Sequence, residues 1–264
     1  MKVAFIGGGN MAGALIGGMV QAAFNAPDID VLEIDAARRA ELAERHQVCT
    51  RERPGDWLPA SEVIVLAVKP QQMREAAAAI QPYLKQQLVL SIAAGVRAET
   101  IRGWLASDRI VRAMPNMPAV IRAGITAAIA LPEVSTAQKT SADRILSAVG
   151  AVIWLEDEAM LDAVTAISGS GPAYIFYFIE AMQAAALELG FDAAQARALT
   201  LHTFTGSAQL AAQSHESAAA LREKVTSRGG TTAAALASFE RDKVDEAIAR
   251  AIKAATARAR ELGS

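Results

Sequence analysis

The chain has 264 residues, which is enough for one large domain or two moderate ones with a buried core. Its formal net charge of -2 argues against nucleic acid or an anionic membrane as the main partner. A single cysteine, Cys49, excludes an intrachain disulfide framework and fits the reducing cytoplasm, where we expect the protein. The uncharged stretch from Ala163 to Ile179 is interrupted by serines, glycines and a proline, so we expect no membrane span.

The chain opens with a predicted strand, a glycine-rich turn and the start of a helix. The apolar run Val3 to Ile6 leads directly into Gly7-Gly8-Gly9-Asn10-Met11-Ala12. Gly7 permits a tight turn, Gly9 lets the backbone approach a pyrophosphate, and the small Ala12 allows close packing of helix and strand. Free N–H groups at the helix start would face the phosphate charge. The pattern predicts a dinucleotide-binding unit, although many unrelated enzymes share it.

Acidic and basic residues follow the second predicted strand, Ile29 to Leu32. Glu33 lies roughly 20 residues beyond the glycine loop, where a carboxylate hydrogen-bonds the adenosine ribose of NAD. The negative charges of Glu33 and Asp35 would repel the extra phosphate of NADP. Arg38 and Arg39, which follow closely, could instead bind that phosphate. The alternative is that all four are solvated charges at a strand end. The residues favour NAD but leave the cofactor open.

Five more strand-like runs follow, separated by helical patterns. They are Val63 to Val68, Leu88 to Ile92, Ile110 to Ala113, Gly124 to Ala130 and Val152 to Leu155. Alternating strands and helices predict an α/β fold, with a Rossmann-like, doubly wound parallel sheet over residues 1–155. Ligands bind at the carboxyl ends of such strands, where small residues at Ala67 to Pro70 and Ala93 to Gly95 leave room for a cofactor. Small turn residues are also common for backbone reasons alone.

From Glu156 onward the pattern is helical, which predicts a second, all-helical domain over residues 156–264. Pro172 suits the first turn of a helix, with Ser170 or Gly171 as its cap. The run from Ala173 to Ile179 is apolar or aromatic on every face, so this helix should be buried all round. We expect an oligomer interface to bury it.

A second unusual loop runs from Val225 to Ala233 between two predicted helices. Ser227, Gly229 and Gly230 can expose consecutive N–H groups at a helix start, which creates a site for a small carboxylate. Thr231 and Thr232 add hydroxyl groups. The alternative is a glycine turn with Ser/Thr capping.

Neither a catalytic acid nor a metal site stands out. The three histidines are isolated in sequence, and none belongs to a metal-ligand spacing. Reduction of an imine needs only a positioned hydride donor and a hydroxyl group, because the protonated C=N already carries its activating charge. This inventory therefore favours imine reduction without a metal.

Taken together, these motifs resemble the pyrroline-5-carboxylate reductase family over essentially the whole chain. The matching runs are FIGGGNMAGALIGG from Phe5, AVKPQ from Ala67, SIAAGV from Ser91, RAMPNMPA from Arg112, ISGSGPAY from Ile167 and VTSRGGTTAAAL from Val225. The last two are specific in combination, whereas the glycine loop alone is not.

The resemblance implies roles for two groups of residues. Pyrophosphate contacts fall on Ile6, Gly7, Gly8, Gly9, Asn10 and Met11, and the lining toward the nicotinamide on Ala67, Val68, Lys69, Pro70, Ala93 and Ala94. Contacts with the substrate carboxylate fall on Ser227, Gly229, Gly230 and Thr231. Thr232 would hydrogen-bond the ring nitrogen and is the candidate for a proton relay, hence the catalytic residue.

The family reduces 1-pyrroline-5-carboxylate to L-proline with NADPH or NADH, the last step of proline biosynthesis. Its helical domain forms an interlocked homodimer that composes the active site across the interface, and some members assemble into decamers. Three departures matter: Glu33-Ile34-Asp35 replaces a Ser, Asn or Arg cluster that grips the NADP phosphate, Arg228 replaces a proline, and Lys224 replaces an asparagine. The alternatives are a β-hydroxyacid-type dehydrogenase or other imine reductase, and a dinucleotide-sensing protein without activity.

Overall fold

The computed structural model describes residues 1–263, which contacts divide into two compact units. The first unit holds Met1–Ser170 together with the residues from Ala255 onward, and the second holds Gly171–Ala254. No helix in the described part of the chain is long and apolar enough to cross a membrane. The expected division into a dinucleotide-binding Rossmann domain over residues 1–155 and an all-helical dimerisation and substrate-binding domain over residues 156–264 stays a prediction.

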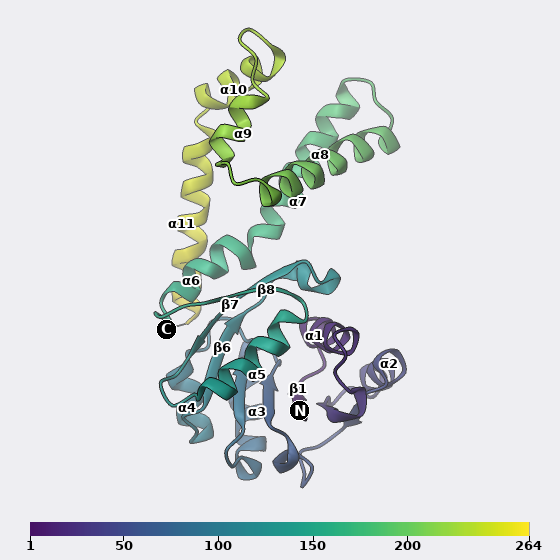
Figure 1. Cartoon of the computed structure of the whole chain (residues 1–264), viewed down its shortest axis with the longest axis vertical. Coiled ribbons are helices and arrows are strands. Elements are labelled where there is room, and N and C mark those ends of the chain that lie inside the picture. The colour runs from purple at the N-terminus through teal and green to yellow at the C-terminus, as the bar shows by residue number, and fades with distance from the viewer. Residues whose placement is uncertain (264) are drawn as a thin grey trace. The chain divides into compact units, whose positions relative to one another are not determined.

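The first unit is built on an eight-stranded sheet with the order β3-β2-β1-β4-β5-β6-β7-β8 (Figure 1). Its strands are β1 (Val3–Ile6), β2 (Ile29–Leu32), β3 (Cys49–Arg51), β4 (Val63–Leu66), β5 (Leu88–Ser91), β6 (Ile110–Met114), β7 (Gly124–Ala130) and β8 (Gly150–Trp154). Ile6 pairs with Leu32 on one side and with Leu66 on the other. The carboxyl ends of β1, β2 and β4 are therefore in register at the same edge of the sheet. The strand order reverses between β1 and β4, where such sheets bind ligands.

The sheet is mostly parallel, but the expectation of a fully parallel sheet is wrong at one edge. β7 runs antiparallel to β6, with Val111 opposite Ala130, and β8 is parallel to β7. The connection from β6 to β7 spans only residues 115–123 and includes the 3-10 segment η5 (Met117–Ile121). A parallel return needs a crossover of roughly a dozen residues or more, so this short connection forces the reversal.

Helices cover both faces of the sheet. They are α1 (Asn10–Gln21), α2 (Ala36–His46), α3 (Met73–Ile80), α4 (Ala98–Leu105) and α5 (Thr136–Ser147). Val3 and Phe5 belong to an apolar cluster that contains buried residues of α1 and α5, whereas Ala4 and Ile6 belong to one with α3 and α4. Since β1 is buried on both faces, its residues are all apolar rather than alternating.

The short strand β3 was not predicted from the sequence. It pairs Cys49 with Asp30 and Arg51 with Leu32 along the outer side of β2. Three residues with a threonine and an arginine carry no periodic apolar signal. Only the pairing with β2 makes this segment a strand.

After β8 the chain stays helical through the serine- and glycine-rich stretch. Helix α6 (Met160–Val164) continues through a π-helical turn, η6 (Thr165–Gly169), into α7 (Gly171–Glu188). The Ser170 N–H donates to the Thr165 carbonyl oxygen over 2.8 Å, and the Ser170 dihedrals are helical. The expected cap at Ser170 is therefore wrong, although Pro172 does lie in the first turn of α7.

The second unit consists of helices whose large apolar side chains are exposed in the single chain. Besides α7 it contains α8 (Ala193–Gln213), α9 (Ala218–Lys224), α10 (Thr231–Arg241) and most of α11 (Val244–Leu262). No residue of α7 is buried, and Phe176 and Tyr177 are 55% and 70% exposed. The burial of α7 on all sides that the sequence predicts is thus absent within one chain. Exposed apolar surface of this extent is typical of a contact with another protein.

Candidate functional site

The glycine loop between β1 and α1 is packed closely against its neighbours at Gly7 and Gly8. Gly7 has a φ of +99°, and a Cβ there would lie 2.8 Å from Val68 Cγ1 and 2.9 Å from the Ala67 carbonyl oxygen. A Cβ at Gly8 would lie 2.6 Å from Leu42 Cδ1. Gly9 is the N-cap of α1 and no side chain caps this helix, so its first N–H groups face outward. An uncapped helix start behind a close-packed glycine loop fits a pyrophosphate group.

Glu33 ties the glycine loop to the end of β2. Its Oε2 accepts a hydrogen bond of 2.8 Å from the Gly8 N–H, and its Oε1 accepts one of 2.9 Å from the Asp35 N–H. Each carboxylate oxygen still has a free lone pair for a ligand hydroxyl group. The Glu33 carboxylate therefore stabilises the glycine loop and can also accept a hydrogen bond from a ligand.

A cavity of about 790 Å³ lies beside this loop. Of the residues predicted from the sequence, it is lined by Ile6, Gly7, Gly9, Glu33, Ala67, Val68 and Lys69. The predicted residues Gly8, Asn10, Met11, Pro70, Ala93 and Ala94 do not line it. Its volume is within the range of small-molecule and cofactor sites. The chain thus brings seven of the thirteen expected dinucleotide contacts together around one cavity.

The two arginines after β2 have different surroundings. Arg39 Nη1 donates to the carbonyl oxygens of Glu33 and Ile34, over 2.7 and 2.8 Å, and Arg39 Nη2 lies 3.7 Å from Glu52 Oε2. Arg39 is therefore engaged by the protein itself. Arg38 lines the cavity, and its Nη1 is 3.9 Å from where a Gly9 Cβ would lie.

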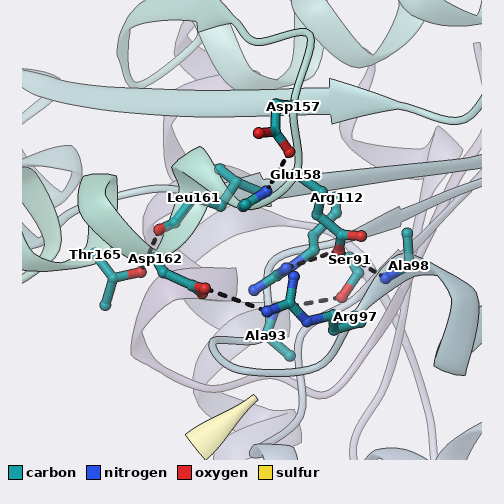
Figure 2. A network of polar contacts seen from close by, with 11 residues as sticks. Ser91, Ala93, Arg97, Ala98, Arg112, Asp157, Glu158, Leu161, Asp162 and Thr165 are labelled. Atoms are coloured by element: carbon teal, nitrogen blue, oxygen red, sulfur yellow. Dashed lines mark hydrogen bonds and ion pairs between the residues drawn. The ribbon is translucent and has the colours of Figure 1, made fainter. Parts of the chain in front are cut away.

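The carboxyl ends of β5 and β6 carry a polar network that sequence reasoning missed (Figure 2). Arg112 Nη1 lies 2.7 Å from Glu158 Oε1, and Arg97 Nη2 lies 3.3 Å from Asp162 Oδ2. The Arg112 and Asp162 side chains are each 4% exposed. A charged residue in the middle of the apolar run Ile110 to Met114 is the one signal that could have revealed it. The network adjoins Ala93, whose N–H points to Ser91 Oγ at 3.4 Å.

The second predicted loop forms the start of α10 in the helical unit. Gly229 has a φ of +72°, Gly230 is the N-cap, and a Cβ at Gly230 would overlap the Ser227 hydroxyl group. No side chain caps α10, so the alternative of Ser/Thr capping is not what the structure shows. The N–H groups of its first turn are free to bind an anion. Thr231 is exposed and Thr232 is half-buried at this helix start.

Across residues 1–263 no group of three or more His, Cys, Asp or Glu side chains is arranged to hold a metal ion. The glycine loop between β1 and α1 and the loop at the start of α10 are the candidates for binding ligands, because each leads into a helix whose first turn has no side-chain cap.

Comparison with known proteins places both parts of the chain. Residues 158–262 match the family model described as "Pyrroline-5-carboxylate reductase dimerisation", and residues 2–95 match "NADP oxidoreductase coenzyme F420-dependent". Residues 2–95 thus belong to a dinucleotide-binding domain of the NADP-binding kind, and residues 158–262 form a dimerisation domain, which implies a homo-oligomer.

Full-length relatives agree with these models. The pyrroline-5-carboxylate reductase of Pseudomonas aeruginosa is 43% identical over 99% of this chain and 96% of its own length. A structure of a pyrroline-5-carboxylate reductase from Coxiella burnetii superposes with a TM-score of 0.95 at 38% identity and covers 100% of this chain and 98% of that one. A Plasmodium falciparum pyrroline carboxylate reductase structure with NADP bound gives a TM-score of 0.89 at 27% identity, covering 100% and 98% of the two chains. The chain belongs to the pyrroline-5-carboxylate reductase family.

Proposed function

We propose that this chain reduces 1-pyrroline-5-carboxylate to L-proline with a hydride from NADH or NADPH, the last step of proline biosynthesis. The observation that carries the proposal is the uncapped start of α10, with Gly229 at a positive φ and two threonines in its first turn. Family membership supports the same reaction.

The substrate carboxylate would bind at the start of α10. Ser227, Gly229, Gly230 and Thr231 form this site. The Gly230 N–H donates to the Ser227 carbonyl oxygen over 3.0 Å and closes the turn, and the N–H groups of the other three residues are the donors to the carboxylate. The positive end of the helix dipole favours the negative charge. Thr232 holds the ring nitrogen through its hydroxyl group and is the group through which a proton reaches that nitrogen. Among residues 1–263 no hydrogen bond of the Thr231 or Thr232 hydroxyl group is found, so both hydroxyl groups can bind a ligand.

The dinucleotide would lie along the carboxyl ends of β1, β4 and β5. The glycine loop from Ile6 to Met11 receives the pyrophosphate, Glu33 binds the adenosine ribose, and the segments Ala67–Pro70 and Ala93–Ala94 border the nicotinamide. When bound, the cofactor supplies a hydride to the imine carbon. The protein's own contribution is to hold the ring in register and to stabilise its charge, which are the effects that lower such barriers most.

We also propose that NADH is preferred to NADPH. Glu33 and Asp35 both line the cavity, and Arg39 is already bound to two carbonyl oxygens and placed near Glu52. A 2′-phosphate would therefore meet two carboxylates, and of the two arginines after β2 only Arg38 lines the cavity without being bound to backbone carbonyl oxygens. Like charges held this close raise the energy of the NADPH complex.

The test is turnover of 1-pyrroline-5-carboxylate with NADH and with NADPH. The rate is measured from the oxidation of the reduced nicotinamide. We expect kcat/KM to be about tenfold higher with NADH, and failure of well-folded protein to oxidise either cofactor would disprove the reaction. Glu33→Gln keeps an oxygen for the Gly8 N–H but removes the charge, so it should shift the ratio toward NADPH by about tenfold. An unchanged ratio would remove Glu33 from cofactor choice.

For the assembled state we propose a homodimer, with a decamer as the alternative, and a cytoplasmic location. The exposed aromatic side chains of α7 support self-association, and the single cysteine supports a reducing compartment. Light scattering of the purified protein distinguishes two copies from ten.

A further inference from the structure

Two acidic residues anchor the segment that follows β8 onto the carboxyl ends of β5 and β6 (Figure 2). Glu158 Oε1 accepts hydrogen bonds from Arg112 Nη1, over 2.7 Å, and from the Ala98 N–H, over 2.8 Å. Asp162, four residues later in α6, accepts one of 3.3 Å from Arg97 Nη2. The two pairs bridge 46 and 65 residues of sequence, so they join parts of the first unit that no local signal connects.

The contacts converge on the loop between β5 and α4, residues 92–97. At its beginning the buried Ser91 hydroxyl accepts from the Ala93 N–H, over 3.4 Å. At its end Arg97 is the N-cap of α4 and has no side-chain cap bond, while the next N–H, of Ala98, is taken by Glu158. The Glu158 carboxylate therefore satisfies an N–H group in the first turn of α4, as a capping side chain usually does. It differs from a usual cap in coming from a distant part of the chain.

We propose that Glu158 and Asp162 are positioning residues that hold the 92–97 loop in place at the nicotinamide end of the cofactor. The proposal rests on the proposed function only in taking Ala93 and Ala94 as neighbours of the nicotinamide. Neither acid touches the reacting atoms, because both act through Arg97, Arg112 and the Ala98 amide.

Burial makes this arrangement stiff. The Asp162 side chain is 4% exposed and that of Arg112 is also 4% exposed, so each charge depends on its partner. The segment from Glu158 to Asp162 is therefore held to the sheet edge by buried charges, and the loop bonded to it is held in turn.

The experiment compares two ligands of the full-length protein. NADH carries the nicotinamide, whereas ADP-ribose carries only the adenosine and pyrophosphate portions. In Asp162→Asn and Arg97→Gln we expect the Kd of NADH to rise about fivefold or more, while the Kd of ADP-ribose stays within about twofold of the wild-type value. A loop displaced by about 1 Å costs as much as 10²-fold in rate, so kcat should fall while KM for the imine changes little.

Two further variants separate positioning from stability. Arg97→Lys retains the charge and should recover most of the NADH affinity. Glu99→Gln, on the same helix, removes an exposed ion pair with Arg102 and should leave both Kd values unchanged. Thermal unfolding identifies any variant that has lost its fold. Glu158→Gln, which keeps an oxygen for the Ala98 N–H but removes the charge opposite Arg112, then carries the comparison, with the same rise expected in the Kd of NADH alone.

Equal weakening of NADH and ADP-ribose, or no weakening of either in folded variants, would overturn the proposal. Because the comparison of the two Kd values needs no turnover, it also holds if 1-pyrroline-5-carboxylate proves not to be the substrate. Failure of the reaction and failure of the positioning role are therefore told apart.

Discussion

The two units bury their apolar side chains in different ways. In the first unit β1, β4 and β5 are buried along their whole length, and two apolar clusters fill the space on either side of the sheet. In the second unit α7 has no buried residue, although its sequence is as apolar as a core helix. The first unit is thus stabilised by contacts within one chain, whereas the second has surface suited to another chain.

The largest expected effect tests this contrast directly. Phe176→Glu places a charge in the exposed aromatic surface of α7, where desolvation on association would be costly. We expect the dissociation constant of the oligomer to rise about 30-fold or more, since a central interface aromatic is worth about 2 kcal/mol or more. Light scattering over a dilution series measures it, and Phe176→Leu is the matched apolar control.

The same variant examines the independence of the first unit. NADH should bind Phe176→Glu within about twofold of wild type, because the cavity beside the glycine loop is formed within the first unit. Loss of NADH affinity in a dissociated protein would show that the dinucleotide site also needs the second chain.

The next effect concerns the helical unit alone. Thr232→Ala should lower kcat by about tenfold or more, the contribution expected of a group that positions or relays a proton. Affinity for NADH should not change, and Thr232→Ser, which keeps the hydroxyl group, should retain most of the activity. Wild-type kinetics in Thr232→Ala would exclude this residue from the mechanism.

Matched helix caps sharpen the comparison of stability. Ser135 caps α5 in the first unit, and Ser217 caps α9 in the second, each by accepting from a backbone N–H. Replacing either serine by alanine should cost about 1 kcal/mol. The Tm of the transition that Ser217→Ala lowers should rise with protein concentration, because association stabilises the second unit, whereas the Tm of the transition that Ser135→Ala lowers should not. Thermal unfolding at two concentrations measures both, and equal concentration dependence would contradict the contrast.

The smallest effect is a pH dependence within the first unit. Burial against α1, reinforced by the nearby Arg45, lowers the pKa of His46 below its ordinary value of 6.5. The unfolded chain then binds the proton more readily, so this stabilising contribution is complete above pH 6.5 and is lost as the pH falls through the folded-state pKa. Unfolding at a series of pH values should show a shallower loss in His46→Gln, and an identical slope would refute the role of His46.

Much of the architecture was readable from the sequence. The buried strands were predicted because continuous apolar runs between turn residues are typical of strands covered on both faces. Both glycine-containing loops were predicted because the positive φ at Gly7 and at Gly229 favours glycine. This conformational preference acts at single positions, so it is visible in the sequence. The direction of β7 and the existence of β3 were not readable, since pairing is decided by segments distant in sequence.

By itself the sequence determined which loops can hold a dinucleotide and a small carboxylate, because glycine positions and helix starts are properties of a few consecutive residues. Only the tertiary structure decided that Glu33 holds the Gly8 N–H, that Arg39 is engaged elsewhere, and that α10 begins uncapped. The same holds for the pairs of Arg97 with Asp162 and of Arg112 with Glu158. The physical reason is that the function of a charged side chain depends on the partner that folding brings within about 3 Å. That partner is distant in sequence, so no local residue pattern predicts it.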